Sequence, residues 1–291
     1  MQLGLFLMPL VAEVETFREI VLRADREAGI HSIWLAEPHL LAFDEYSSVF
    51  PYTEDGKMPE DYSVEGELDG LLGLAYVAAL TERVRLGIGV CVVPQWKPVS
   101  IAKYVTTLDH FSKGRFDLGV GIGWLEEEFR AVGASFEDRV AVTRSNLAVM
   151  RALWSESGEG KEDLPPELAG VQEPFPLQRP HPPIHFGGNS RPALRRVAEG
   201  GQGWLPWELG PEEATEKIGT LEQLLEANDR ERGEIYVTVA TEAPLEQIDV
   251  DAYAAAGIDQ LLIVVQPKRS GREVEQLFDR LDSTVAAVAA T

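Results

Sequence analysis

A carboxylate and a histidine stand two residues apart in the segment Glu37-Pro38-His39, directly after the apolar run IWLA. A histidine is the side chain best suited to transfer a proton near neutral pH, and a nearby carboxylate can orient it or raise its pKa. The alternative is an ordinary pair of surface residues. We interpret His39 and Glu37 as the candidate catalytic residues.

A second candidate site is the segment FGGNS at residues 186–190, where two glycines precede a predicted helix. The glycines leave backbone N–H groups unshielded, and the N-terminus of a helix attracts anions. Asn189 or Ser190 can serve as the N-cap. The pattern predicts an anion-binding site at Gly187, Gly188, Asn189 and Ser190, with a simple strand-to-helix turn as the alternative.

Glycines also gather where two predicted strands end, at residues 85–93 and 115–122. Glycine at the mouth of a parallel strand lets the backbone approach a flat or phosphorylated ligand closely. Gly89, Gly121 and Gly123 are therefore candidate cofactor contacts. The alternative is tight packing of strand on helix with no ligand.

These segments lie on strands and helices that alternate along the chain. Strands are expected at residues 3–8, 32–36, 85–93, 115–122, 184–186, 203–205, 235–240 and 260–265, and helices at 14–28, 71–80, 99–111, 139–155, 192–199, 212–227, 250–256 and 273–290. Such alternation implies a parallel sheet covered by helices. Eight units predict one (β/α)8 TIM-barrel domain over residues 1–291, with its active site at the carboxyl ends of the strands. A doubly wound sheet is the alternative, but no G-x-G-x-x-G turn follows the first strand.

Two insertions interrupt the alternation, one after strand two at residues 40–70 and one before strand five at 158–183. The first is strongly acidic and leaves the end of the barrel where the chemistry is expected. Long loops of this kind are usually lids or disordered. We interpret the first as an active-site lid, with a solvated acidic loop as the alternative, and the second as structural.

Composition excludes several classes of partner. The net charge of −22 argues against binding to nucleic acid or to an anionic membrane surface. The single cysteine, Cys91, rules out an intramolecular disulfide and fits a reducing cytoplasm. The only close histidine pair, His181 and His185, is separated by prolines that forbid the helical geometry of a metal site, so no metal is expected. We expect a soluble, cytoplasmic protein.

Three blocks carry a resemblance to a known family: LTERVRLGIGV at residues 80–90, KPVSIAKYVTTLDHFSKGRFDLGVGIGWLEEEF at 97–129, and PPIHFGGNSRPALRRVAEGGQGWLP at 182–206. They resemble the luciferase-like monooxygenase superfamily and, more narrowly, its subgroup of oxidoreductases that use coenzyme F420, a 5-deazaflavin. The blocks follow the family's order from about Leu3 to Leu205. The likeness continues more loosely to the C-terminus.

The resemblance implies roles for further residues. The FGGNS segment would bind the cofactor's phosphate, and the Gly89–Val90 peptide would be a non-prolyl cis bond against the back of the flavin ring. Trp124 and Glu127 would edge the cofactor, although Trp124 is also suited to plain core packing. Relatives often place an acidic residue directly before the histidine that faces the ring, whereas Pro38 separates the two here.

The sequence departs from its relatives on the helix expected at residues 139–155. They commonly carry an Arg and a Glu where this chain has Val142 and Ser145, so a charge pair is not expected there. Arg139 and Arg144 remain nearby. The arginines after FGGNS are expected to be solvated helix positions: Arg191, Arg195 and Arg196.

These features predict an oxidoreductase that uses reduced coenzyme F420 for hydride transfer to or from a small organic substrate. The alternative is a monooxygenase that uses FMNH2 and oxygen. Two other classes compete with these, a metal hydrolase and a protein that holds a flavin without turnover. Since relatives are often dimers, we expect a homodimer.

Overall fold

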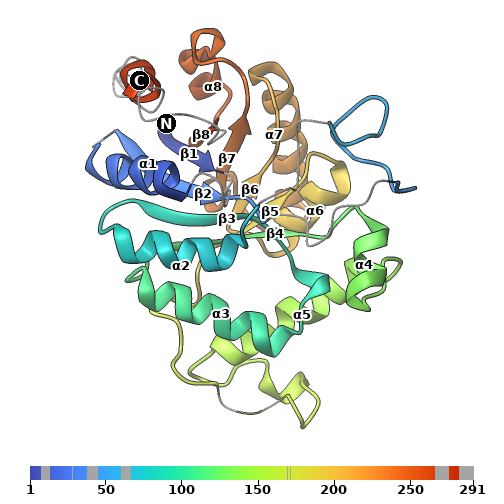
Figure 1. Ribbon diagram of the computed structural model, residues 1–291. Helices are drawn as coiled ribbons and strands as arrows, with labels where there is room; N and C mark the ends of the chain where they lie inside the picture. The colour runs from blue at the N-terminus through green and yellow to red at the C-terminus, as the bar shows by residue number, and fades with distance from the viewer. Residues whose placement is uncertain are drawn as a thin grey trace.

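The computed structural model of the chain describes residues 1–7, 14–27, 29–37, 45–59, 67–168, 170, 172–265 and 275–281. Eight parallel strands form a closed barrel, in which each strand pairs with the next and the last pairs with the first (Figure 1). The strands are β1 Gln2–Leu7, β2 Ile30–Leu35, β3 Arg85–Val92, β4 Phe116–Gly121, β5 Ile184–Gly187, β6 Gly203–Leu205, β7 Tyr236–Thr241 and β8 Gln260–Val265. The predicted (β/α)8 fold is confirmed.

The longer helices surround the barrel because their apolar residues pack on the outer face of the strands. The α-helices are α1 Val14–Arg26, α2 Gly70–Leu80, α3 Pro98–Phe111, α4 Glu126–Val132, α5 Arg139–Trp154, α6 Arg191–Gly200, α7 Pro211–Glu226 and α8 Val250–Ala255. Short 3-10 turns lie at Val93–Gln95, Lys161–Asp163, Arg232–Glu234 and Leu245–Gln247. Of the helix expected at 273–290, residues 275–281 are described and helical, and the others lie outside the described residues.

One helix, α4, was not predicted. It has only seven residues, too few for a clear apolar period. Three glutamates fill its first turn, where the positive end of the helix dipole favours acidic side chains. It ends at Gly133, which adopts the left-handed conformation.

A polar network fills the barrel at the amino ends of the strands. Arg85 donates to both carboxylate oxygens of Asp117, over 2.8 and 2.6 Å, and His185 Nε2 lies 3.8 Å from Asp117 Oδ1. Burial alone would raise the pKa of Asp117, but its interactions with His185 and Arg85 outweigh burial and lower that pKa. This end of a barrel generally serves stability. His185 is therefore a structural residue.

Two negative findings hold for the described residues. No group of three or more His, Cys, Asp and Glu side chains in the described ranges is placed to hold a metal ion. Within the same ranges, no helix is both long and apolar enough to cross a membrane.

Candidate functional site

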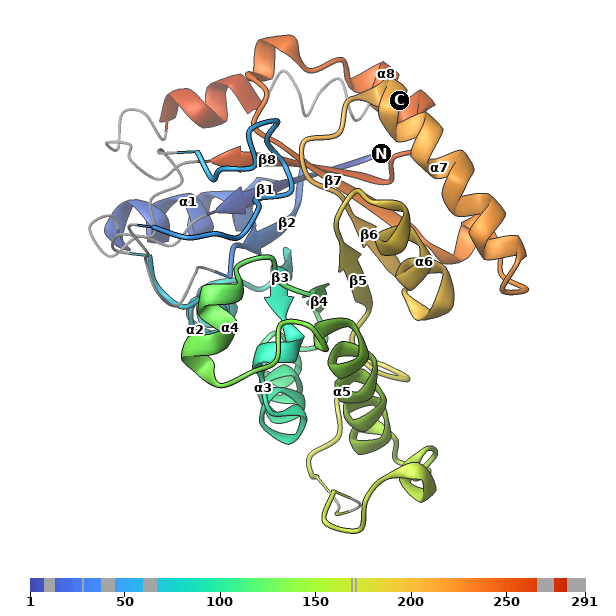
Figure 2. The same ribbon diagram turned by 90° about the vertical axis from the view of Figure 1, so that its right-hand side faces the viewer.

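An apolar cluster, here called the floor, lies towards the carboxyl ends of the strands. These strand ends face the viewer in Figure 2. Its buried part consists of Phe6, Trp34, Leu205, Ala240 and Leu262, and its partly exposed part of Ala36, Val90, Trp207 and Val264. The rings of Phe6 and Trp207 meet edge to face with centroids 5.3 Å apart. Barrel enzymes keep their active sites at this end. A flat aromatic ligand could lie on this floor.

Gly87 leaves the space that Trp34, a buried residue of the floor, occupies. A Cβ atom on Gly87 would lie only 2.2 Å from Trp34 Cδ2, so no other residue fits beneath that indole. Trp34 belongs to β2 and Gly87 to β3, and the two are paired across the sheet. The glycine in this run therefore serves packing.

Helix α6 begins beside the floor, directly after β5. Ser190 is its N-cap and accepts a hydrogen bond from the N–H of Ala193 over 3.4 Å. Trp204 Nε1 donates to the carbonyl oxygen of Gly188 over 2.9 Å. Because C=O and N–H point in opposite directions across a trans peptide, the N–H of Asn189 points away from Trp204. The N–H groups in the first turn of a helix have no intrahelical acceptor and are available to an anion.

Asn189 has a different role from the one expected of its side chain. Its amide nitrogen donates to the carbonyl of Trp207 over 2.6 Å, and its amide oxygen accepts from the N–H of Trp207 over 3.0 Å. Both polar atoms of the Asn189 side chain thus bind the backbone of Trp207 and hold that residue on the floor. The backbone N–H of Asn189 and the second N–H of its amide group can still take part in the predicted anion site, and the N-cap is Ser190.

Glu37 ties the end of β2 to the end of β3. Its carboxylate accepts hydrogen bonds from the N–H of Val92 over 2.7 Å and from Trp96 Nε1 over 3.1 Å. Burial raises the pKa of Glu37 to about 7, although these two donors and the thiol of Cys91 oppose the rise. A carboxyl group with a pKa near neutrality is suited to proton transfer. His39 lies outside the described residues.

The raised pKa of Glu37 predicts a particular dependence of stability on pH. The folded protein holds this proton more tightly than the unfolded chain, so stability falls as pH rises from 4.5 towards 7. Between about pH 5.5 and about pH 8, this group should lower the free energy of unfolding by about 2 kcal/mol. We expect Glu37→Gln to remove that part of the decline in the free energy of unfolding, measured by urea unfolding at several pH values. The control is a substitution of an exposed residue, Glu222→Gln, which should keep the wild-type slope of unfolding free energy against pH. An unchanged slope in Glu37→Gln would contradict the raised pKa.

Glu127 and Trp124 hold the first insertion against the loop that follows β4. Glu127 Oε1 accepts from the N–H and hydroxyl of Ser47, over 2.7 and 2.9 Å, and its Oε2 accepts from the hydroxyl of Ser48 over 2.7 Å. The hydrogen bonds from Ser48 and Ser47 lower the pKa of Glu127 to about 2. The Trp124 ring lies edge to face with Tyr46 and Phe50, at centroid distances of 5.6 and 5.1 Å.

The insertion therefore lies on the side of the barrel predicted for a lid. Residues 45–59 and α4 both lie on the right-hand side in Figure 1, next to the carboxyl ends of the strands. The remaining parts of this insertion, 40–44 and 60–66, lie outside the described residues. Trp124 and Glu127, predicted to edge the cofactor, contact the insertion; their contact with a cofactor stays a prediction.

The glycines singled out at the strand ends are surrounded by protein side chains. A Cβ on Gly89 would lie 2.6 Å from Phe6 Cε2, and one on Gly121 would lie 2.5 Å from Val90 Cγ2. A Cβ on Gly123 would lie 2.5 Å from the ring of Phe129. Tight packing thus accounts for all three, and direct ligand contact by their backbone stays a prediction. The Gly89–Val90 peptide bond is cis, as the resemblance implies.

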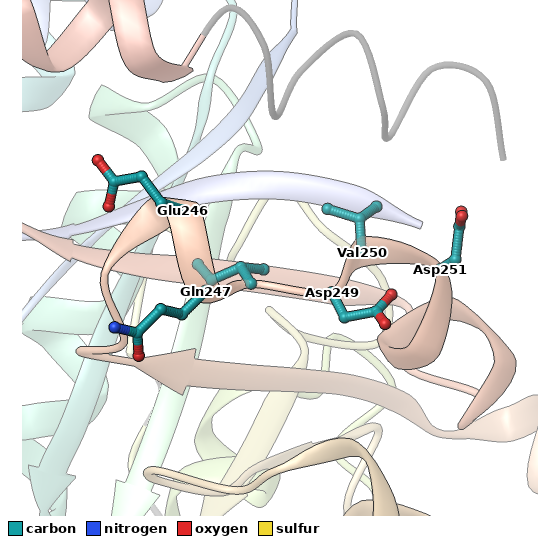
Figure 3. A pocket seen from close by; sticks show the side chains of 6 residues that line it. Glu246, Gln247, Asp249, Val250 and Asp251 are labelled. Carbon is teal, nitrogen blue, oxygen red and sulfur yellow. The ribbon is translucent and has the colours of Figure 1, made fainter.

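A surface hollow lies between β7 and α8, lined by Glu246, Gln247, Ile248, Asp249, Val250 and Asp251 (Figure 3). Three of these six residues are acidic and none is basic. Asp249 already caps α8 by accepting from the N–H of Ala252 over 2.9 Å. An anionic cofactor would be repelled here, so the hollow is no candidate for its site.

The floor and the N-terminus of α6 together fit a flat aromatic cofactor with an anionic tail. The floor offers an apolar surface for the ring, and the N-terminus of α6 offers backbone N–H donors for the anionic tail. Sequence reasoning missed Trp207, although its place two residues after β6 was a usable signal. It also expected Arg196 to be solvated, whereas the Nε atom of Arg196 is buried. Arg191 and Arg195 are exposed as expected.

Comparison with known proteins gives the chain relatives that use two kinds of cofactor. It is 28% identical to an uncharacterised protein of Mycobacterium tuberculosis, over 81% of this chain and 82% of that one. It is 27% identical to the oxygenase component of a flavin-dependent trigonelline monooxygenase from Acinetobacter baylyi, over 73% of this chain and 54% of the relative.

Solved structures share the fold at low sequence identity. The coenzyme F420-dependent tetrahydromethanopterin reductase from Methanopyrus kandleri superposes with a TM-score of 0.66 at 14% identity, covering 92% of this chain and 94% of that one. The sequence pattern of the luciferase-like monooxygenases matches residues 1–283. The protein therefore belongs to the luciferase-like monooxygenase family, whose members are oxidoreductases and monooxygenases.

Proposed function

We propose that this protein is an oxidoreductase that uses reduced coenzyme F420 for hydride transfer to or from a small organic substrate. The observation that supports a flavin or deazaflavin cofactor is the apolar floor beside the N-terminus of α6. When bound, the cofactor supplies two-electron hydride chemistry, and the protein supplies orientation and a proton.

Each part of the site has a task in this proposal. Val90 and Trp207, which are partly exposed on the floor, support one face of the cofactor ring. The backbone of residues 187–190 binds the phosphate. His39 or Glu37 donates or accepts the proton, and the floor excludes water from the ring face. The insertion at residues 45–59 covers the open side as a lid.

The alternative is a monooxygenase that uses FMNH2 and oxygen, and the flavin-dependent relative from Acinetobacter baylyi favours it. The same floor and helix N-terminus would accept either ring. Deazaflavin reacts poorly with oxygen, so the identity of the cofactor decides the class of reaction. The resemblance to the F420-dependent subgroup supports the first choice.

A titration separates the two. The purified protein should bind deazaflavin at least about 10-fold more tightly than FMN, because the tail of the deazaflavin offers more anionic groups to local donors. The net charge of −22 repels an anionic cofactor, but salt screens this repulsion over distance. Hydrogen-bond donors close to the cofactor can therefore outweigh it. Fluorescence titrations with both cofactors, in both redox states and at two salt concentrations, make the measurement. Tight FMN binding with oxygen consumption, and no deazaflavin affinity, would establish the monooxygenase instead.

We also propose a cytoplasmic homodimer, with α2 as part of the contact. This helix carries no charged residue, and it exposes 74% of Leu72 and 40% of Tyr76. In a chain of net charge −22, two copies repel each other least where acidic residues are absent. Sedimentation velocity should show a dimer that Leu72→Glu converts to a monomer, and a wild-type monomer would refute it.

A further inference from the structure

Three arginines gather beside the site, where α5 faces α6. Arg139 and Arg144 come from the first turns of α5, and Arg196 comes from α6. Arg144 Nη2 donates to both carboxylate oxygens of Glu199, over 3.1 and 2.8 Å. Burial, then the positive charges of Arg144 and Arg139, lower the pKa of Arg196, while Glu199 opposes the change. Arg144 and Arg196 thus share the carboxylate of Glu199.

Two of these guanidinium groups have unused donors. The Nε atoms of Arg139 and Arg196 are buried and have no hydrogen-bond partner in the described parts of the chain. Arg139 is nevertheless fixed in place, because its guanidinium lies 3.8 Å above the ring of Phe136 and its Nη1 donates to the Phe136 carbonyl over 2.7 Å. Leaving such donors unpaired costs about 1–3 kcal/mol each. An anion beside these guanidinium groups would balance their charge.

The position of the cluster indicates which anion. Arg196 is six residues beyond the N-cap Ser190, which places it about 9 Å along the axis of α6 from the proposed phosphate site. The insertion approaches the same place, since the charge of Arg196 acts on the phenol of Tyr52 and opposes the rise that burial causes in its pKa. A chain that extends outwards from the phosphate along α6 would reach Arg196.

We propose that Arg139, Arg144 and Arg196 bind the carboxylates of the acidic tail of the deazaflavin cofactor. The inference rests on the proposed function and extends it to a part of the cofactor that FMN lacks. A guanidinium group can donate two parallel N–H groups to the two oxygens of a carboxylate, whereas the ammonium group of a lysine cannot. The cluster is therefore the feature of this site that distinguishes deazaflavin from FMN.

The test is a fluorescence titration with two probes, the deazaflavin with its acidic tail and the deazaflavin 5′-phosphate without it. Arg139→Gln and Arg196→Gln should each weaken binding of the tailed cofactor about 10-fold, the usual effect of one lost hydrogen bond to a charged group. Both should bind the tailless phosphate within about two-fold of wild type, since that probe does not reach the cluster. Arg195→Gln, exposed on the same helix, is the matched control, and Arg196→Lys should restore most of the affinity if charge matters.

Each other outcome overturns the inference in a distinct way. Wild-type affinity of both glutamine variants for the tailed cofactor would remove the arginines from its site. An equal loss for both probes would assign the arginines to the phosphate. If wild-type protein binds neither deazaflavin but binds FMN, the proposed function itself fails. Unchanged cofactor affinity with a raised KM for an anionic substrate would assign the cluster to the substrate.

Discussion

Gly188→Leu is expected to abolish cofactor binding while the barrel stays folded. Gly188 has a φ of +99°, which L-residues rarely adopt, and a Cβ there would lie 3.3 Å from Ala193 Cβ. A leucine side chain would shift this turn and cover the N–H groups that receive the phosphate. Losing two charge-assisted hydrogen bonds weakens binding by at least about 100-fold. Fluorescence titration with deazaflavin and FMN measures the loss.

The control for backbone strain is Gly133→Leu. Gly133 also has a positive φ, +74°, but nothing lies within 4 Å of its Cβ position. Both substitutions should cost about 1–3 kcal/mol of stability for their backbone conformation, by thermal or urea unfolding. Only Gly188→Leu should lose the cofactor. Unchanged affinity in that variant would remove residues 187–190 from the phosphate site.

His39→Ala is expected to cut turnover by about 100-fold or more, the usual scale for a lost proton donor. The affinity of this variant for the cofactor should stay within a few-fold of wild type, because the floor and the N-terminus of α6 are the parts proposed to bind the cofactor. Steady-state rates and titrations on the same preparation separate the two effects. His31→Ala is the matched control, because His31 lies near the amino end of the strand that precedes His39.

Two results would change the assignment of His39. Turnover that survives the substitution would move the proton transfer to Glu37 or to a residue of the lid. A collapse of cofactor affinity would make His39 a binding residue. A pH profile of the wild-type rate adds a check, since a Glu37 carboxyl with a pKa of about 7 would titrate in the same range.

Much of the fold is readable in local pattern. For example, β3 is a run of apolar and β-branched residues, and α3 has apolar residues at helical spacing. Such patterns predict a strand and a helix without knowledge of the neighbouring elements. Alternation then leads to a closed parallel barrel. The helix α4 escaped this reasoning because seven residues with three glutamates show no stripe. Its formation depends on contacts with the insertion, such as the N–H of Glu126 donating to Ser48 over 2.8 Å.

The sequence by itself determined the family, the barrel and the segments that meet at the carboxyl ends of the strands, and it left the N-cap of α6 open between Asn189 and Ser190. These depend on neighbours in the chain, on helix and strand periods and on motif order. Only the tertiary structure decided what individual side chains contact. It assigned Asn189 to Trp207, Glu127 to Ser47 and Ser48, and Arg196 to the neighbourhood of Arg139 and Arg144. The physical reason is that hydrogen bonds and burial link residues from 18 to 80 positions apart, a separation at which local pattern carries no information.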